Sequence, residues 1–393
     1  MARVRLKRHE DKRLKAGHPW VYRTEIEDVY GSFAPGDIVE VEDGRGKFIG
    51  RGYINPASMI TIRLLTYERG EEIDEAFWRR RLSAAWSYRQ KVLHGADTDS
   101  CRVVFGEADF LPGLIVDKFG PYLVVQTLAL GIDRFQGTLV KLLDELIRPE
   151  GIYERNDAAV RELEGLPLRT GFLKGEFDPL VIIRENGIRL YVDMARGQKT
   201  GYFLDQRENR AAIRPLVRGA RVLDCFCHTG SFSLHAARYG AREVLGLDIS
   251  EEAIEMARRN AELNGYGDIC TFEVANVFDA LREMERSGEK YEVIILDPPA
   301  FVKSRKALEG AIRGYKEINL RAMKLLSPGG FLVTCSCSYH MPEDLFLEVV
   351  FSAARDARRR LRLVARRGQA GDHPVLLGYE ESCYLKCLVL QVI

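Results

Sequence analysis

A chain of 393 residues with 46% hydrophobic residues and a formal net charge of +1 is long enough for two or three domains rather than one. It contains no apolar run near the ~20 residues that a membrane-spanning helix needs, and its first residues are too charged for a secretory signal, so we expect a cytoplasmic protein that does not enter a membrane. Its eight cysteines are then expected to be reduced thiols.

Basic residues are concentrated in two segments despite the nearly neutral total. Residues 1–23 carry eight Lys or Arg against two acids, and residues 355–367 carry seven Arg against one Asp. Such segments can bind nucleic-acid phosphates, but the solvated face of a helix or a loop has the same composition. The charge pattern therefore leaves nucleic-acid binding open.

Residues 1–71 are predicted to form a small β-barrel. Hydrophobic residues occur at Ile38, Val39 and Val41, a glycine turn follows at 44–46, and further strand-like runs lie at 48–49 and 60–65. The glycines lack both the spacing and the following helix of a phosphate-binding loop, so we exclude such a loop here.

Residues 72–195 are predicted to form a compact α+β domain. Apolar residues recur at helical spacing over 72–95, which indicates an amphipathic helix. The other expected elements are strands within 102–120 and 121–130, a helix near 135–147, and strands near 151–153 and 187–192. This segment contains no cluster of catalytic residue types, so its composition predicts no chemistry.

Strands and helices alternate regularly within residues 196–393. Such alternation predicts a Rossmann-like α/β domain, in which helices cover both faces of a largely parallel sheet. The expected strands lie at 221–225, 243–248, 271–275, 291–297, 330–334, 361–364 and 385–392, and the expected helices lie at 231–239, 251–264, 310–326 and 343–355.

The first two strand ends of this sheet predict a cofactor site, because ligands bind beyond the carboxyl ends of the strands in such folds. One strand ends at Asp224, and Gly230 precedes the next helix, where a glycine lets the backbone approach a ligand. Asp248 ends the second strand, where it can accept hydrogen bonds from both hydroxyls of a ribose. The loop lacks the G-x-G-x-x-G pattern of dinucleotide sites, and Asp224 would repel a pyrophosphate but attract the amino group of a methionine moiety. The pattern therefore favours S-adenosylmethionine (SAM) over NAD.

Two later strand ends predict a reacting site beside this cofactor. The fourth strand leads into Asp297-Pro298-Pro299, where the two prolines stiffen the chain and direct the Asp into the crevice. The fifth strand leads into T-C-S-C-S, which contains Cys335 and Cys337. A thiolate that adds to C6 of a pyrimidine makes C5 nucleophilic, so a Cys at this place suits methylation of C5. Either thiol fits this role from the sequence alone.

The two C-x-C pairs, Cys225/Cys227 and Cys335/Cys337, also raise the alternative of a zinc or iron–sulfur site. Structural zinc usually has wider ligand spacing, and the first and fifth strands are not neighbours in the expected sheet order. We therefore expect no metal.

Several motifs in order identify a family resemblance that covers essentially the whole chain. The segments GQKTGYFLDQRENR, LDCFCHTGSFSLHAA, LDPPAFVKS, RGYKEINLRAMKLL, TCSCS and GDHPV together resemble the ribosomal RNA large subunit methyltransferase I family. The resemblance implies a class I methyltransferase domain whose mostly parallel sheet has a C-terminal antiparallel strand. It also implies that HPWVY and GDIVEVEDGRGKFIGRGYINPAS belong to a PUA domain, a small RNA-binding barrel.

The resemblance also assigns roles to individual residues. The family's reactive cysteine matches Cys337, and its motif IV aspartate, which would hold the cytosine edge, matches Asp297. The cofactor positions match Asp224, Phe226, Gly230 and Asp248, and the upstream segment contributes Lys199, Tyr202, Asp205 and Gln206 as neighbours of the cofactor or the active site.

Three departures from the family pattern affect these assignments. Asn276 stands where members often carry an Asp near the adenine, and its carbonyl oxygen can still accept a hydrogen bond from the adenine amine. Ala300 occupies a place that is often Lys. Cys335, beside Cys337, weakens the assignment of the nucleophile.

The expected substrate is large-subunit ribosomal RNA, with a second copy of the chain as a further candidate partner. A base in folded RNA must be unstacked before it reaches the cofactor, and a separate RNA-binding barrel would hold the RNA during that step. His18, Trp20 and Arg23 are candidates for this contact, although Trp20 is more typical of a barrel core.

The expected reaction is addition of Cys337 to C6 of a cytosine, methyl transfer from SAM to C5, proton loss from C5 and elimination of the cysteine. The base that removes the proton is not identifiable from the sequence. Three alternatives stay open at this point: methylation of an exocyclic amine, an RNA-binding assembly factor that retains SAM without catalysis, and a metal-binding redox protein.

Overall fold

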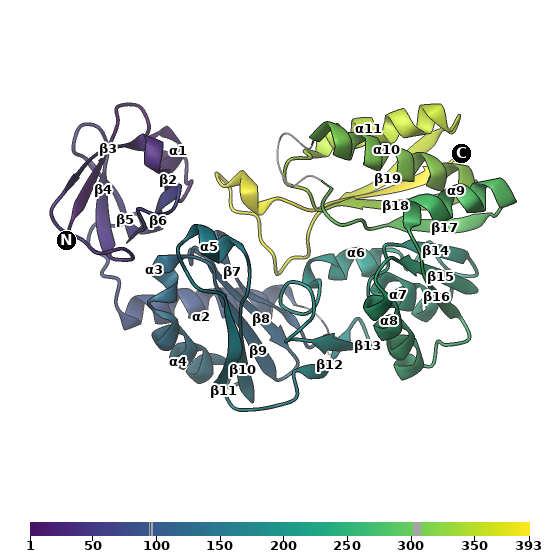
Figure 1. The fold of residues 1–393 in the computed structure, drawn as a ribbon, viewed down its shortest axis with the longest axis horizontal. Coiled ribbons are helices and arrows are strands. Elements are labelled where there is room, and N and C mark those ends of the chain that lie inside the picture. Colours follow the sequence, from purple (N-terminus) through teal and green to yellow (C-terminus); the bar gives the residue numbers. More distant parts are fainter. Residues whose placement is uncertain (94, 96, 302–307) are drawn as a thin grey trace. The chain divides into compact units, whose positions relative to one another are not determined.

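The computed structural model describes residues 1–93, 95, 97–301 and 308–393 (Figure 1). The chain forms two compact units, each built from three segments. Unit 1 comprises Met1–Ile183, Val192–Leu204 and Gly371–Ser382, and unit 2 comprises Arg184–Tyr191, Asp205–Ala370 and Cys383–Ile393. The division into three domains at 71/72 and 195/196 stays a prediction.

Unit 1 begins with a six-stranded β-sheet in the order β2-β6-β5-β4-β1-β3. Its centre consists of aliphatic side chains from alternate strand positions, such as Val4, Val39 and Ile62, which are inaccessible to solvent. The strands are β1 (Arg3–Leu6), β2 (Trp20–Tyr22), β3 (Ile26–Tyr30), β4 (Ile38–Glu42), β5 (Phe48–Ile54) and β6 (Ile60–Thr66), with a short helix α1 (Lys12–Lys15).

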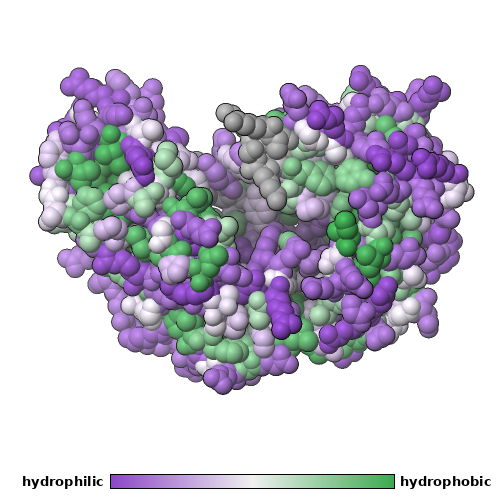
Figure 2. All heavy atoms as spheres, in the orientation of Figure 1, coloured by the Kyte–Doolittle hydropathy of each residue, from purple (hydrophilic) through white to green (hydrophobic). Residues whose placement is uncertain are grey.

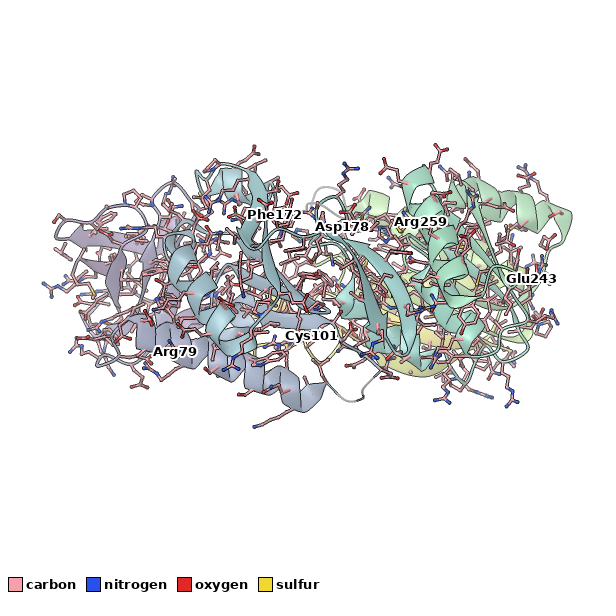
Figure 3. The ribbon with its side chains drawn as sticks, turned by 90° about the horizontal axis from the view of Figure 1, so that it is seen from below. Arg79, Cys101, Phe172, Asp178, Glu243 and Arg259 are labelled. Atoms are coloured by element: carbon pink, nitrogen blue, oxygen red, sulfur yellow. The ribbon has the colours of Figure 1, made fainter. Side chains whose placement is uncertain are left out.

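The remainder of unit 1 is a five-stranded sheet in the order β11-β10-β9-β8-β7, covered by helices. Helix α2 (Glu75–Val92) begins after Asp74, whose side chain accepts a hydrogen bond from Phe77 N. Residue 94 of the helix expected over 72–95 lies outside the described residues. In Figure 3, Arg79 marks α2 and Cys101 marks the first residue of β7. The other elements are β7 (Cys101–Phe105), β8 (Leu114–Phe119), β9 (Tyr122–Thr127), α3 (Leu130–Asp133), α4 (Gln136–Ile147), β10 (Gly151–Asn156), α5 (Val160–Leu163) and β11 (Arg169–Lys174).

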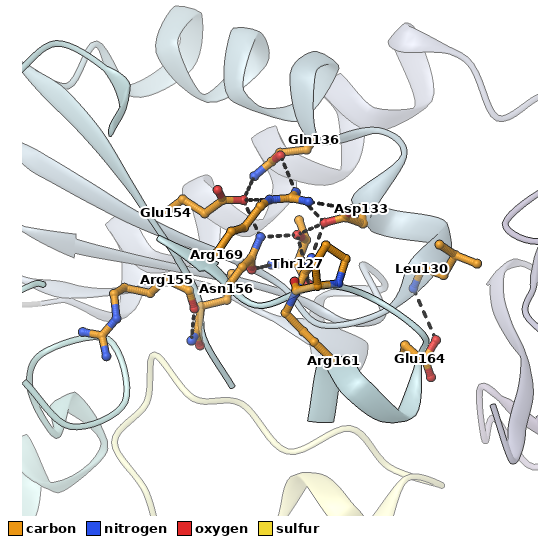
Figure 4. Close-up of polar contacts among 12 residues, drawn as sticks. Thr127, Leu130, Asp133, Gln136, Glu154, Arg155, Asn156, Arg161, Glu164 and Arg169 are labelled. Atoms are coloured by element: carbon orange, nitrogen blue, oxygen red, sulfur yellow. Dashed lines mark hydrogen bonds and ion pairs between the residues drawn. The ribbon is translucent and has the colours of Figure 1, made fainter. Parts of the chain in front are cut away.

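A buried polar network joins three strands of this sheet to α3 and α5 (Figure 4). Asp133 accepts hydrogen bonds from Thr127 Oγ1 at 2.6 Å, Arg161 Nη1 at 2.9 Å and Arg169 Nη2 at 2.8 Å, and Glu154 accepts one from Arg169 Nε at 2.7 Å. Burial alone would raise the pKa of Asp133, but the hydrogen bonds from Thr127 and Arg161 lower it overall. Two carboxylates thus face two guanidinium groups, so the charges are paired, and removal of one partner would leave a poorly solvated charge.

Unit 2 is a seven-stranded sheet in the order β16-β15-β14-β17-β18-β20-β19. The first five strands in this order run parallel, whereas β20 is antiparallel to both β18 and β19. The strands are β14 (Arg221–Cys225), β15 (Glu243–Asp248), β16 (Cys270–Val274), β17 (Tyr291–Leu296), β18 (Leu326–Ser336), β19 (Leu361–Arg367) and β20 (Lys386–Val392). The expected Rossmann-like sheet with a C-terminal antiparallel strand is confirmed.

Helices cover both faces of this sheet. Figure 1 shows α9, α10 and α11 on one face and α7 and α8 on the other. Tyr315 and Phe346, from α10 and α11, pack with Leu296 and Leu332 in one hydrophobic core. Figure 3 labels Glu243 on β15 and Arg259 on α8. The helices are α6 (Arg207–Ala212), α7 (Ser231–Arg238), α8 (Glu251–Asn264), α9 (Val277–Ser287), α10 (Leu308–Leu325) and α11 (Glu343–Asp356), and the hairpin of β12 (Leu180–Glu185) and β13 (Ile188–Asp193) contributes to both units.

Hydrophilic residues cover most of the face drawn in Figure 2, with smaller hydrophobic groups between them. Among the described residues, no helix combines the length and the apolar character needed to cross a membrane.

Candidate functional site

Four predicted site residues lie at one edge of the sheet in unit 2. Asp224, Asp248 and Asp297 are at or just beyond the carboxyl ends of β14, β15 and β17, and Cys337 follows β18. These strands are parallel and adjacent in the order β15-β14-β17-β18, so their carboxyl ends meet at the same edge. The structure therefore brings the predicted cofactor and reacting residues together at one edge of the sheet.

The loop after β14 has an unusual backbone. Phe226, His228 and Gly230 have φ angles of 63°, 49° and 81°, in the left-handed region that residues other than glycine rarely adopt. Such strain is typical of ligand-binding loops. A Cβ at Gly230 would lie 3.0 Å from the Phe272 ring and 3.1 Å from Ala257 Cβ. The glycine is thus required by its φ angle and by packing against β16 and α8, in addition to any ligand approach expected from the sequence.

Asp224 is a buried carboxylate with one oxygen that lacks a hydrogen-bond partner among the described residues. Its Oδ2 accepts hydrogen bonds from Ser233 N at 3.0 Å and Ser233 Oγ at 2.7 Å, whereas its Oδ1 is buried and accepts none from the described part of the chain. Burial raises the pKa of Asp224 to about 7, and the negative charges of Asp297 and Asp248 add to this effect although Ser233 opposes it. A cationic group such as the amino group of SAM would satisfy Oδ1 and the charge together.

Asp248 and Asn276 occupy the next two strand ends. Asp248 Oδ2 accepts from His228 N at 2.9 Å and Oδ1 accepts from Ser250 N at 3.0 Å, which fixes the carboxylate while each oxygen keeps a further lone pair. Asn276 is exposed, and its Oδ1 caps α9 by accepting a hydrogen bond from Phe278 N at 3.0 Å. Ile249, which follows Asp248, is 71% exposed, so it offers an apolar surface that the sequence did not reveal.

Gln206 and Asp205, which the resemblance gives as neighbours of the cofactor or the active site, lie in unit 2. Gln206 is buried, and its Nε2 donates a hydrogen bond to Asp297 Oδ1 at 2.8 Å. Asp205 Oδ2 accepts a hydrogen bond from the Tyr384 hydroxyl at 2.6 Å. The structure therefore brings Gln206 directly to the predicted reacting residue.

Lys199 and Tyr202 belong to unit 1, and their part in the site stays a prediction. Lys199 has a positive φ of 55°, and its Nζ lies 4.6 Å from the centre of the Phe203 ring. The Tyr202 side chain is buried.

The two thiols of T-C-S-C-S have different surroundings. Cys335 is completely buried on β18 opposite Cys387 on β20, and the hydrogen bond with Cys387 together with burial raises the pKa of Cys335. Cys337 lies beyond the end of the strand, is partly exposed, and has its Sγ 4.0 Å from the Pro298 carbonyl oxygen. Only the second thiol is thus open to a substrate at this edge.

Lys386 on β20 is a charged neighbour of this segment that the sequence did not single out. Its Nζ donates hydrogen bonds to the carbonyl oxygens of Ser338 at 2.6 Å and Tyr384 at 2.8 Å. Burial lowers the pKa of Lys386 to about 8, and the nearby Cys337 and Cys383 oppose this effect. The ammonium group therefore lies within electrostatic reach of the Cys337 thiol.

The two C-x-C pairs do not converge. Strand β17 separates β14, which carries Cys225, from β18, which carries Cys335. All eight cysteines are free thiols, and the described residues contain no cluster of His, Cys, Asp or Glu able to hold a metal ion.

Aromatic rings lie beside the same sheet edge. The ring centre of Phe226 is 6.5 Å from that of Phe278 and 6.3 Å from that of Phe301. A hollow of about 550 Å³ adjoins two of these rings, and it is lined by Phe278, Phe301, Glu309, Gly310, Ala311, Arg313 and Gly314. Residues 302–304, which complete the L-D-P-P-A-F-V-K-S motif, lie outside the described residues.

The candidate RNA contacts of the barrel are largely engaged within unit 1. His18 is buried, and its Nδ1 accepts a hydrogen bond from Trp20 N at 3.1 Å. Trp20 Nε1 donates to Glu107 at 2.8 Å, whereas Arg23 is exposed and donates to the carbonyl oxygens of residues 56–58. Of the three, Arg23 is the most accessible to RNA.

Comparison with known proteins is consistent with this geometry. The model of the PUA-like domain matches residues 4–67, and the model of the S-adenosylmethionine-dependent methyltransferase family matches residues 153–389. The chain is 43% identical over 392 residues to ribosomal RNA large subunit methyltransferase I of Shewanella amazonensis, covering 99% of both chains.

Two solved structures share the whole fold. A Streptococcus mutans chain assigned as a SAM-dependent methyltransferase matches over 100% of both chains with a TM-score of 0.85 at 21% identity. A methyltransferase solved in complex with S-adenosylhomocysteine (SAH) matches with a TM-score of 0.86, also at 21% identity and over 100% of both chains.

Proposed function

Because the chain belongs to the ribosomal RNA large subunit methyltransferase I family of SAM-dependent methyltransferases, we propose that it methylates C5 of a cytosine in large-subunit ribosomal RNA. SAM is its cofactor, and when bound it supplies an electrophilic methyl group. The substrate is proposed from the relative's name, and the chemistry from the residues at the sheet edge.

The residues around β14 and β15 fit SAM. The buried Oδ1 of Asp224 would pair with the amino group, and Asp248 would accept hydrogen bonds from the ribose hydroxyls. Phe226 and Gly230 shape the loop between them, and Asn276 would accept from the adenine amine.

The partly exposed thiol of Cys337 carries the proposal for the reaction. Its thiolate would add to C6 of the cytosine, which places electron density on C5 for bond formation with the methyl group. Loss of the C5 proton to a base then restores the C5–C6 double bond and expels the cysteine. Asp297 would accept a hydrogen bond from the cytosine amino group and hold the ring during these steps.

We expect Cys337→Ala to abolish cytosine methylation while Cys335→Ala retains it, because only Cys337 is exposed to the substrate edge. The measurement is transfer of labelled methyl groups to undermethylated ribosomal RNA. RNA that contains 5-fluorocytosine provides a second readout, because fluorine at C5 prevents elimination and traps the Cys–C6 adduct.

A folding control and three contrary outcomes accompany this test. SAH binding should be equal in both variants if they are folded. Methylation that survives Cys337→Ala would point instead to an exocyclic amine, and an adduct on Cys335 would reassign the nucleophile. RNA binding by the wild type without methyl transfer would indicate an assembly factor.

A further inference from the structure

A line of hydrogen bonds connects β19 to Asp297 through the interior of unit 2. Arg367 Nε donates to Asn209 Oδ1 at 3.0 Å, Asn209 Nδ2 donates to Gln206 Oε1 at 2.7 Å, and Gln206 Nε2 donates to Asp297 Oδ1 at 2.8 Å. Gln206 and Asn209 are 3% and 1% exposed, so water does not compete for these bonds. We refer to Arg367, Asn209 and Gln206 as the amide relay.

The direction of the relay follows from the chemistry of its ends. A guanidinium group can only donate hydrogen bonds, so the oxygen of the Asn209 amide must face Arg367 and its NH2 must face Gln206. The Gly368 carbonyl, which can only accept, receives a second hydrogen bond from Asn209 Nδ2 at 3.0 Å and requires the same orientation. Gln206 must therefore present its oxygen to Asn209 and its NH2 to Asp297.

We propose that Asn209 and Arg367 are positioning residues that hold the Asp297 carboxylate as an ionised acceptor and so select a base that carries an amino group. The inference rests on the proposed function, because it assigns Asp297 to the base edge. An ionised carboxylate has about four lone-pair sites, so it can accept from Gln206 and also from a cytosine amino group. Uracil presents a carbonyl oxygen at that place. Binding of uracil is therefore disfavoured, because its oxygen and the Asp297 carboxylate would be two acceptors that face each other.

Asn209→Asp reverses the relay with little change in shape. An aspartate at 209 can only accept, so Gln206 must turn its NH2 toward residue 209 and its oxygen toward Asp297. That oxygen favours the protonated form of Asp297, which gains an O–H donor and accepts a weaker hydrogen bond from the cytosine amino group than the carboxylate does. Asp224 on β14 and Cys335 on β18 are titratable groups that interact electrostatically with Asp297, and the variant leaves both in place.

The test is the pH profile of cytosine C5 methylation together with the preference for cytosine over uracil in otherwise identical RNA. We expect Asn209→Asp to lower kcat/KM at pH 8 by roughly 10- to 100-fold and to reduce the cytosine preference, as expected when a buried hydrogen bond is mismatched. Asn264→Asp on α8 is the matched control, because within the described part of the chain its side chain bonds only to the Arg189 and Asn260 carbonyl oxygens and the Arg189 amide. It should leave the profile unchanged.

Variants of Arg367 test the same inference from the other end, where the side chain is partly exposed. Arg367→Lys keeps an obligate donor and should retain the wild-type profile and preference. The glutamine of Arg367→Gln can donate or accept, so this variant should lose part of the activity at pH 8 and part of the cytosine preference. This pair decides the question if Asn209→Asp does not fold.

Equal profiles for Arg367→Lys and Arg367→Gln, or a wild-type profile and cytosine preference for folded Asn209→Asp, would overturn the inference. Failure of the proposed function has a different signature, because wild-type protein would then leave cytosine C5 unmethylated. Binding of SAH and the melting temperature, measured for every variant, separate these outcomes from unfolding.

Discussion

Among single residues, Asp224 combines complete burial with a raised pKa, which links the stability of the cofactor-free protein to pH. Its pKa is about 7 in the fold against 3.8 ordinarily. Between these values the folded chain keeps a proton that the unfolded chain has lost, so the contribution of Asp224 to stability falls as the pH rises from about 4 to 7. A bound cation would reverse this loss by favouring the ionised form.

We expect Asp224→Asn to remove this pH dependence. Relative to the variant, the wild type should lose about 1–3 kcal/mol of unfolding free energy between pH 5 and pH 8, because each unit of pKa shift corresponds to about 1.4 kcal/mol. Denaturant unfolding of both proteins without cofactor, at several pH values, measures the difference. Parallel curves for the two proteins would mean that Asp224 ionises normally in the fold.

Individual site residues could be predicted from the sequence to different degrees. Asp224, Asp248 and Asp297 follow directly from strand ends in an alternating pattern. The strand pattern alone left the choice between Cys335 and Cys337 open, because it depends on where β18 ends and on its pairing with β20, and only the family resemblance assigned Cys337. The amide relay was out of reach as well, since its members come together only when β19 joins the sheet.

At the scale of single elements, α9 is capped by a residue that is also a predicted contact of the adenine. Asn276 precedes α9 and caps it through Oδ1, which satisfies an amide that the first turn leaves unpaired. Asp performs the same function, so the departure from the family pattern at this position preserves the cap.

Asn276→Ala should therefore destabilise the cofactor-free protein by about 1 kcal/mol, whereas Asn276→Asp should have little effect. Urea unfolding of both variants beside the wild type measures these costs. An equal loss in the two variants would show that Asn276 acts through its amide NH2 rather than through its cap.

Elements with clear boundary signals were predicted with accurate bounds. Helix α8 spans the expected 251–264, because Ser250 caps its start and Gly265 adopts a positive φ at its end. Helix α9 was not predicted, although Val277, Leu281 and Met284 recur at helical spacing and face the core. Helix α6, with six residues, is too short for a periodic pattern.

The whole molecule contains separate hydrophobic cores in its two units. Leu123 on β9 belongs to a core of unit 1, and Leu247 on β15 belongs to the core of unit 2. Sequence patterns could not reveal how the chain is shared between the units. In the sequence, Gly371–Ser382 stands between two segments of unit 2, but it belongs to unit 1. Hydrogen bonds from Arg89 and Arg102 to Asp372 hold it there.

We expect thermal unfolding to show two transitions that respond to different substitutions. Leu123→Ala should lower the midpoint temperature of one transition, and Leu247→Ala that of the other. Each substitution should reduce the unfolding free energy of its unit by about 2–5 kcal/mol, because both leucines are fully buried. Differential scanning calorimetry of the three proteins tests this expectation. A single transition that both substitutions lower equally would show that the units unfold as one.

The position of β20 has a consequence for synthesis on the ribosome. This strand follows β19 in the chain but lies between β18 and β19 in the sheet. A nascent chain that ends after β19 therefore leaves β18 with an unpaired edge, which is prone to wrong associations. Translation of β20 fills this gap and delivers Lys386 to the neighbourhood of Cys337, so the sheet and the environment of the thiol mature together.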